Sequence, residues 1–104
     1  KKFQKSLAKK CKLFEKLSKN MLKFNCITHV NTRGMVSGLI FNNTEVATKV
    51  VKKCILKGVL PVCTFKNAIK LGPPLTITIG AIKEAMQVIE ESIKEVEYEQ
   101  NRAW

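Results

Sequence analysis

The sequence is short of the residues that build metal sites and disulfide frameworks. It has one histidine, His29, and four cysteines at irregular spacings without a C-x-x-C pair. A zinc site needs several such ligands clustered at short spacing, so no metal site is predicted. Two disulfides are possible by number, but Cys11 and Cys54 fall beside leucine and valine on helical stripes. Reduced, half-buried thiols are therefore the favoured interpretation for Cys11, Cys26, Cys54 and Cys63.

Long apolar runs and signatures of catalysis are also missing. No stretch approaches the roughly 18 apolar residues that can span a bilayer, and no short hydrophobic segment precedes a small-residue cleavage site. There is no P-loop, no G-x-G-x-x-G fingerprint, and no serine or cysteine beside a histidine partner. We expect no catalytic residue in this chain. His29 falls in an apolar run, which favours a packed or interfacial role for it.

The periodicity of the apolar residues predicts one small domain. Steps of three and four residues predict helices at 3–24, 45–57 and 79–97. Runs rich in β-branched residues between them predict strands at 26–33, 35–42, 59–64 and 68–71. The order α-β-β-α-β-β-α indicates an α+β fold with a small, largely antiparallel sheet covered by helices. We expect the domain to occupy residues 1–97 and a polar tail to follow at 98–104.

Turn and cap residues fix the ends of these elements. Gly34 predicts a turn or bulge between the first two strands, and Asn42-Asn43-Thr44 can cap the middle helix. Gly58 suits the position after that helix, and Thr78 can accept from the free N–H groups of the last helix. The inward face of the middle helix is predicted to consist of Val46, Val50, Val51, Cys54 and Ile55.

The net charge of +11 is distributed unevenly. Residues 1–24 contain nine lysines against one glutamate, whereas residues 84–99 contain six glutamates against one lysine. Helices of opposite sign attract, although each exposed pair contributes only ~0–1 kcal/mol. We therefore expect the basic first helix and the acidic last helix to lie on the same side of the sheet.

Three segments resemble one enzyme family. Residues 67–78, NAIKLGPPLTIT, resemble the N-x-I-R-L-x-P-P-L-T-I-T segment near the C-terminus of class III pyridoxal-phosphate aminotransferases, which act on ornithine, acetylornithine, putrescine or 4-aminobutyrate. Residues 30–41 resemble the family's V-R-G-[KR]-G-L-M-x-G-I-E-F hairpin, with Arg33, Gly34 and Gly38 in register, and residues 57–60 match its R/K-G-V-L step. The order and spacing of these three segments agree with those of the family's motifs, so the resemblance extends over residues 1–97, which correspond to the family's small C-terminal domain.

This resemblance implies that the chain is part of a larger transaminase. The parent enzyme would move an amino group from a primary amine or ω-amino acid to a 2-oxo acid, using pyridoxal 5'-phosphate held by a large domain before Lys1. It would be a homodimer in the cytoplasm, or in the mitochondrial matrix of a eukaryote. The chain opens with Lys1 instead of methionine, which suggests a fragment. The fragment alone is expected neither to bind the cofactor nor to catalyse transamination.

Lys70 is the one residue to which the resemblance gives a substrate role. In the ornithine and acetylornithine type enzymes an arginine at this motif position grips a substrate carboxylate. A guanidinium is planar and can donate two parallel hydrogen bonds to a carboxylate, which an ammonium cannot do. Lys70 therefore either binds a carboxylate more weakly, or another group binds it. The hairpin departs from its pattern as well, because Asn31, Thr32 and Ile40 replace the usual Arg, Gly and Glu.

The alternative hypothesis is a stand-alone basic α+β module. The lysine-rich first helix, with its Phe, Leu and Met stripe, could bind nucleic acid, an anionic membrane or a groove of a partner protein. A basic helix whose apolar stripe covers a sheet is the commoner arrangement, so nucleic-acid binding is disfavoured. Steep weakening of binding with salt would distinguish phosphate recognition from the aminotransferase hypothesis.

Overall fold

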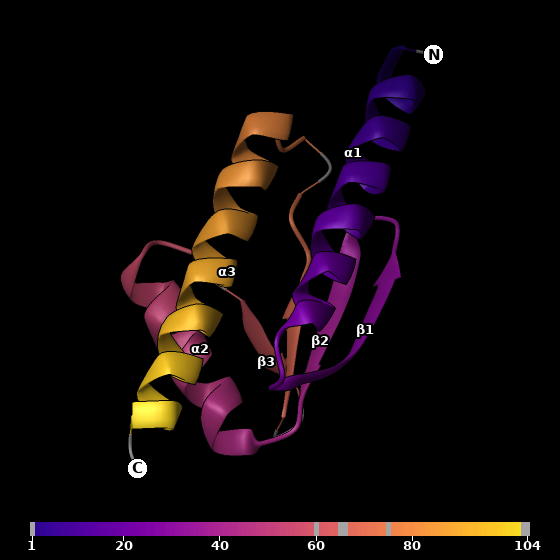
Figure 1. Cartoon of the computed structure of the whole chain (residues 1–104). Coiled ribbons are helices and arrows are strands. Elements are labelled where there is room, and N and C mark those ends of the chain that lie inside the picture. Colours follow the sequence, from indigo (N-terminus) through magenta and orange to yellow (C-terminus); the bar gives the residue numbers. More distant parts are fainter. Residues whose placement is uncertain (1, 60, 65–66, 75, 103–104) are drawn as a thin grey trace.

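The computed structural model describes residues 2–59, 61–64, 67–74 and 76–102 (Figure 1). Its elements are α1 (Lys2–Lys19), the 3-10 helix η1 (Asn20–Lys23), β1 (Ile27–Arg33), β2 (Val36–Phe41), α2 (Thr44–Leu56), β3 (Val62–Thr64), β4 (Ala68–Leu71) and α3 (Ile79–Arg102). The order of helices and strands is the predicted one, so the α+β assignment is confirmed.

The four strands form one antiparallel sheet in the order β1-β2-β4-β3. The β1–β2 hairpin turns at Gly34, whose φ of 57° suits glycine, as the sequence predicts. The later hairpin inserts β4 beside β2 and leaves β3 at the edge. Asn67 fixes this junction, because its carbonyl accepts from Phe41 N at 2.8 Å and its side-chain amide donates to Phe41 O at 3.0 Å.

The helices cover a single face of the sheet. In Figure 1 α1 and α3 lie side by side in front of the strands, and α2 lies beside α3. Strand residues alternate accordingly: Leu39, Phe41 and Ile69 are buried beneath the helices, while their neighbours in sequence point away. The predicted inward residues of the last helix are all buried, namely Ile82, Met86, Ile89, Ile93 and Val96.

The basic α1 and the acidic α3 lie on the same side of the sheet, as predicted. The basic α1–η1 segment and the acidic α3 do pack together, and Lys23 pairs with Glu90 at 3.2 Å. Two further glutamates of α3 pair with Lys53 of α2 and with Lys57 at its C-cap, in Lys53–Glu99 at 2.7 Å and Lys57–Glu95 at 2.8 Å. The Lys57 ammonium lowers the pKa of the Glu95 carboxyl, and the Glu99 carboxylate raises the pKa of the Lys53 ammonium. The acidic helix is therefore held mainly against α2.

The predicted caps are confirmed. Asn43 Oδ1 accepts from Glu45 N at 2.7 Å and from Val46 N at 3.3 Å at the start of α2. Gly58, at φ 90°, ends this helix, because its N–H bonds to Ile55 O and the next N–H reaches Cys54 O. Thr78 Oγ1 accepts from Ala81 N at 3.1 Å at the start of α3.

The structure corrects four predictions made from the sequence. Residues 98–102 continue α3 instead of forming a polar tail, because Glu97 accepts from Cys26 N at 3.0 Å and Glu99 holds Lys53. The third strand begins at Val62 and not at Val59, which lies in the cap of α2. Ile55 is 48% exposed and is not packed inward, and His29 is exposed on the sheet, which excludes the packed role predicted for it and leaves the interfacial one as a prediction.

Ser18 is expected to weaken the domain. Its Oγ is buried in α1 without a hydrogen-bond partner among the described residues, and an unpaired buried hydroxyl costs stability. We expect Ser18→Ala to raise the free energy of unfolding by about 1 kcal/mol in urea denaturation. Ser92→Ala is the matched control, because Ser92 Oγ donates to Val88 O at 2.8 Å in α3. Equal stabilisation by both changes would contradict this account of Ser18.

Candidate substrate-binding site

The face of the sheet opposite the helices carries the candidate site. We call it the open face. It is formed by side chains that alternate with the core residues of the four strands and are exposed or half-buried: His29, Asn31, Arg33, Val36, Gly38, Ile40, Val62, Ala68 and Lys70. No described helix covers this face, so it is the surface on which a ligand or another part of a larger protein can lie.

Lys70 occupies the middle of the open face. Its neighbours Ile69 and Leu71 are buried in the core, which forces the side chain of Lys70 to the opposite side of β4. In the strand register it stands beside Gly38 of β2 and Val62 of β3. No ion pair or hydrogen bond of its ammonium is found within the described part of the chain. The one predicted site residue is thus exposed and available to an anion.

A groove of about 770 Å³ joins Lys70 to the first hairpin. Gly38 lines the groove between Asn31 on one side and Lys70 on the other, and it has no side chain of its own. Arg33 and Val36 flank this hollow, and the groove continues round the edge of β1 to Glu15 and Lys19 of α1. Residues 33 and 38 come from one motif segment and residue 70 from another, so the fold brings the two segments together.

Sequence reasoning missed the role of this groove. It noted Arg33 and Gly38 only as residues in register with a family pattern and assigned neither to a site. The missing information was the pairing of β2 with β4, which places Gly38 opposite Lys70. The signal that could have found it is the alternation of both strands, which puts the two residues on the same face.

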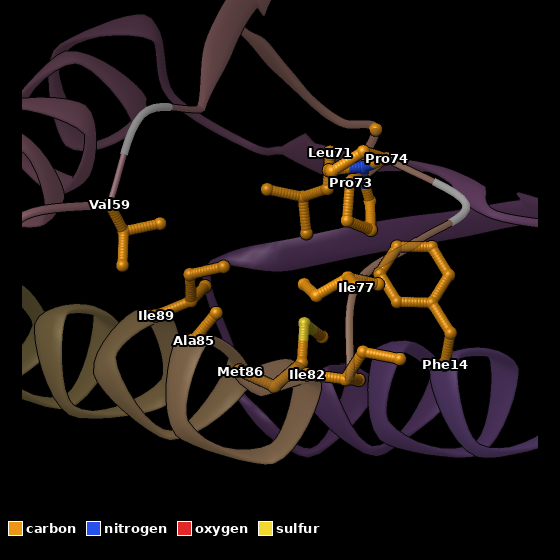
Figure 2. A pocket seen from close by; sticks show the side chains of 11 residues that line it. Phe14, Val59, Leu71, Pro73, Pro74, Ile77, Ile82, Ala85, Met86 and Ile89 are labelled. Atoms are coloured by element: carbon orange, nitrogen blue, oxygen red, sulfur yellow. The ribbon is translucent and has the colours of Figure 1, made fainter. Parts of the chain in front are cut away.

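The double proline after β4 borders a second, apolar pocket. β4 ends at Leu71, as the prolines require, and Pro73 and Pro74 then turn the chain toward α3. Figure 2 shows these prolines across the pocket from Phe14 of α1 and Met86 of α3. The volume of the pocket is about 210 Å³. All of its lining side chains are apolar, so the pocket has no group for acid–base chemistry.

The buried thiols are not nucleophiles. Burial, together with the nearby Glu97 carboxylate, raises the pKa of the Cys26 thiol to about 12. Burial also raises the pKa of the Cys54 thiol. Because the thiolate is the reactive species, both thiols are inert near neutral pH. Cys11, Cys26 and Cys54 are free, and the side chain of Cys63 lies outside the described residues.

Two comparisons identify relatives of this fold, although no protein-family model matches the chain. The acetylornithine aminotransferase of Clostridium acetobutylicum is 33% identical over 85 residues, which are 79% of this chain and 21% of that protein. The crystal structure of acetylornithine aminotransferase from Elizabethkingia anophelis superimposes with a TM-score of 0.80 and 28% identity over 90% of this chain. The chain is a relative of the acetylornithine aminotransferases. It spans about a fifth to a quarter of these enzymes, 21% of one and 26% of the other.

The same fold occurs in an ornithine aminotransferase. The enzyme from Toxoplasma gondii, crystallised in the presence of oxidised glutathione with pyridoxal phosphate partly occupying its active site, matches with a TM-score of 0.80. It covers 94% of this chain at 22% identity, which shows the shared fold alone. The resemblance to acetylornithine and ornithine aminotransferases drawn from the sequence is confirmed, and the chain has the fold of about a quarter of each of these two enzymes.

The described residues of this aminotransferase relative do not by themselves fit pyridoxal phosphate. The cofactor requires a lysine for a Schiff base, an acidic partner for the ring nitrogen and donors for the phosphate. The apolar pocket offers none of these groups. The groove beside Lys70 contains a single carboxylate, Glu15, which pairs with Lys19 at 2.8 Å. With Arg33 and Lys70 among its lining residues, the groove is suited to an anion.

Neither a membrane span nor a metal cluster is found in the part of the chain that the structure describes. None of its helices is long and apolar enough to cross a membrane. Histidine, cysteine and acidic side chains do not gather there in groups of three or more that could hold a metal ion.

Proposed function

We propose that this chain is the small C-terminal domain of a pyridoxal-phosphate-dependent aminotransferase of class III. The enzyme transfers an amino group from a primary amine or ω-amino acid to a 2-oxo acid. Similarity to an acetylornithine aminotransferase over 79% of the chain supports the enzyme class. The observation that carries the site is the exposure of Lys70 on the open face, at the position where the resembled motif has a carboxylate-binding arginine.

The open face suits a surface that a large domain covers. Val36 and Val62 lie on it with 44% and 59% exposure, beside the half-buried Ile40. Covering these apolar side chains would stabilise docking, and it would also enclose the groove at Lys70. A carboxylate in an enclosed groove interacts more strongly with an ammonium, because the local dielectric constant falls. We propose that the large domain of the same protein supplies this cover and holds the cofactor.

The complete enzyme is proposed to be a homodimer in the cytoplasm, or in the mitochondrial matrix if the organism is a eukaryote. When bound, the cofactor would supply the carbonyl chemistry of amino transfer. The role of this chain would be to bind and orient the substrate carboxylate through Lys70 and to exclude water from the groove. The decisive experiment is the kinetic comparison of Lys70 variants described in the Discussion.

The chain alone is expected to have no transaminase activity. Mixed with pyridoxal phosphate near neutral pH, it should give no more aldimine absorbance than surface lysines give, because the lysines that line the groove, Lys19 and Lys70, are exposed to solvent. Absorbance titration followed by borohydride reduction and peptide mapping measures this. A stoichiometric adduct on one lysine, accompanied by amino transfer, would show that the chain is an enzyme by itself.

A further inference from the structure

We propose that Arg33 is a second carboxylate-binding residue and supplies the guanidinium fork that the motif position at Lys70 lacks. This inference deepens the proposed function and rests on it. A substrate carboxylate would lie in the hollow over Gly38, held from β1 by the guanidinium of Arg33 and from β4 by the ammonium of Lys70.

The register of the strands places both cations on the open face. Asn31, Gly38 and Lys70 form one row across β1, β2 and β4. Arg33 and Val36 form the next pair toward the hairpin turn, on the same face of the sheet. Two strand spacings, about 10 Å, separate β1 from β4. Arginine and lysine side chains of ordinary length can therefore converge on one small anion between the strands.

Gly38 makes room for that anion. It lies between the two cationic strands and has no side chain to fill the space, and the groove includes it together with both cations. A Cβ built at this position would meet only Asn31 O, at 4.0 Å. Glycine is therefore not required there by the backbone, and the hollow can be filled by substitution without strain.

The charges around the hollow favour a carboxylate. Neither Arg33 nor Lys70 has an ion pair within the described residues. The one acidic side chain that lines the groove, Glu15, is at its α1 end and pairs with Lys19 at 2.8 Å. Asn31 adds an amide donor beside the hollow. A guanidinium binds a carboxylate through two parallel hydrogen bonds, whereas an ammonium contributes one point charge, so the two groups complement each other.

An exchange of the two cations tests this assignment on the chain itself. Binding of pentanoate is followed by NMR chemical shifts at low ionic strength, with pentanamide as the uncharged control ligand. We expect Arg33→Gln to weaken pentanoate binding about tenfold, the effect of losing a charged hydrogen bond. Arg33→Lys should also weaken pentanoate binding. The double variant Arg33→Lys with Lys70→Arg should restore the affinity to within about twofold of the unchanged protein, because one guanidinium and one ammonium are again present.

Controls separate the hollow from general charge effects. Lys52→Gln removes one exposed positive charge from α2 and should leave binding unchanged. Gly38→Val should abolish binding by filling the hollow, whereas Gly72→Ala, outside the groove, should not. Thermal unfolding of each variant confirms that it is folded.

Two outcomes overturn the proposal for Arg33. One is equal weakening by Arg33→Gln and Lys52→Gln, and the other is failure of the double exchange to restore binding in a folded protein. Either result leaves the proposed aminotransferase function intact, because that function is tested by the kinetics of the complete enzyme. Conversely, pentanoate binding that depends on Arg33 would stand even if the complete protein catalysed a different reaction.

Discussion

Replacing Phe14 with alanine is expected to destabilise the domain by about 3–5 kcal/mol, the usual cost of deleting a buried aromatic ring. Phe14 is 2% exposed and lies where α1 meets the apolar pocket beside Met86 and Pro74. A small domain has a total stability of roughly 5–15 kcal/mol, so the variant should be largely or partly unfolded. Urea denaturation followed by circular dichroism measures the change.

Leu22→Ala is the control for Phe14→Ala. Leu22 belongs to the adjoining η1 and is 49% exposed, so its truncation should cost less than about 1 kcal/mol. If Phe14→Ala lowered the free energy of unfolding as little as Leu22→Ala, the apolar stripe of α1 would not be part of the core. It would then be free to bind a partner, as the basic-module hypothesis requires.

The same burial limits what α1 can do as a binding element. Phe14, Met21 and Phe24 of the predicted stripe are buried, which leaves exposed lysines such as Lys9 and Lys12 on its outer side. Phe14, at 2% exposure, is therefore unavailable to a membrane or a peptide groove while α1 is folded onto the sheet. Contact with a polyanion through lysines alone would be electrostatic and should weaken steeply with salt.

The fold was predictable because its local signals agree with its packing. The alternation of apolar and polar residues predicted β2 and β4, and apolar residues at steps of three and four predicted α1 and α3. Asn43 and Gly58 are residue types that commonly begin and end a helix. The errors in the predicted elements lie where contacts between distant parts of the chain determine the end of an element. α3 continues past residue 97 because Glu97 and Glu99 bind groups in distant parts of the chain, and no local pattern shows such partners.

The candidate site was predictable only in part. The family resemblance pointed to Lys70, and the burial of Ile69 and Leu71 explains why its side chain is exposed. The hollow over Gly38 depends on which strands pair, and the order β1-β2-β4-β3 is not evident from the strand patterns themselves. His29 shows the same difficulty, because a position inside an apolar run did not reveal that its face of the sheet is uncovered.

Replacing Lys70 with alanine in the complete enzyme is expected to raise KM for carboxylate-bearing substrates by about 10- to 100-fold, equivalent to a loss of up to about 1.5–3 kcal/mol of charged hydrogen bonding. Its ammonium is exposed beside the Gly38 hollow and has no ion-pair partner within the described residues. The upper value applies when another domain encloses the groove, since solvent screens an exposed charge. Simple amines without a carboxylate should be affected much less.

Lys70→Arg is the conservative counterpart in this experiment. A guanidinium keeps the charge and adds the fork that suits a carboxylate, so this variant should retain or improve activity on the same substrates. Steady-state kinetics with paired amines that differ only in a carboxylate measure both changes. If Lys70→Ala altered KM equally for both members of a pair, the ammonium would not contact the substrate carboxylate, and Lys70 would be an ordinary surface lysine of the open face.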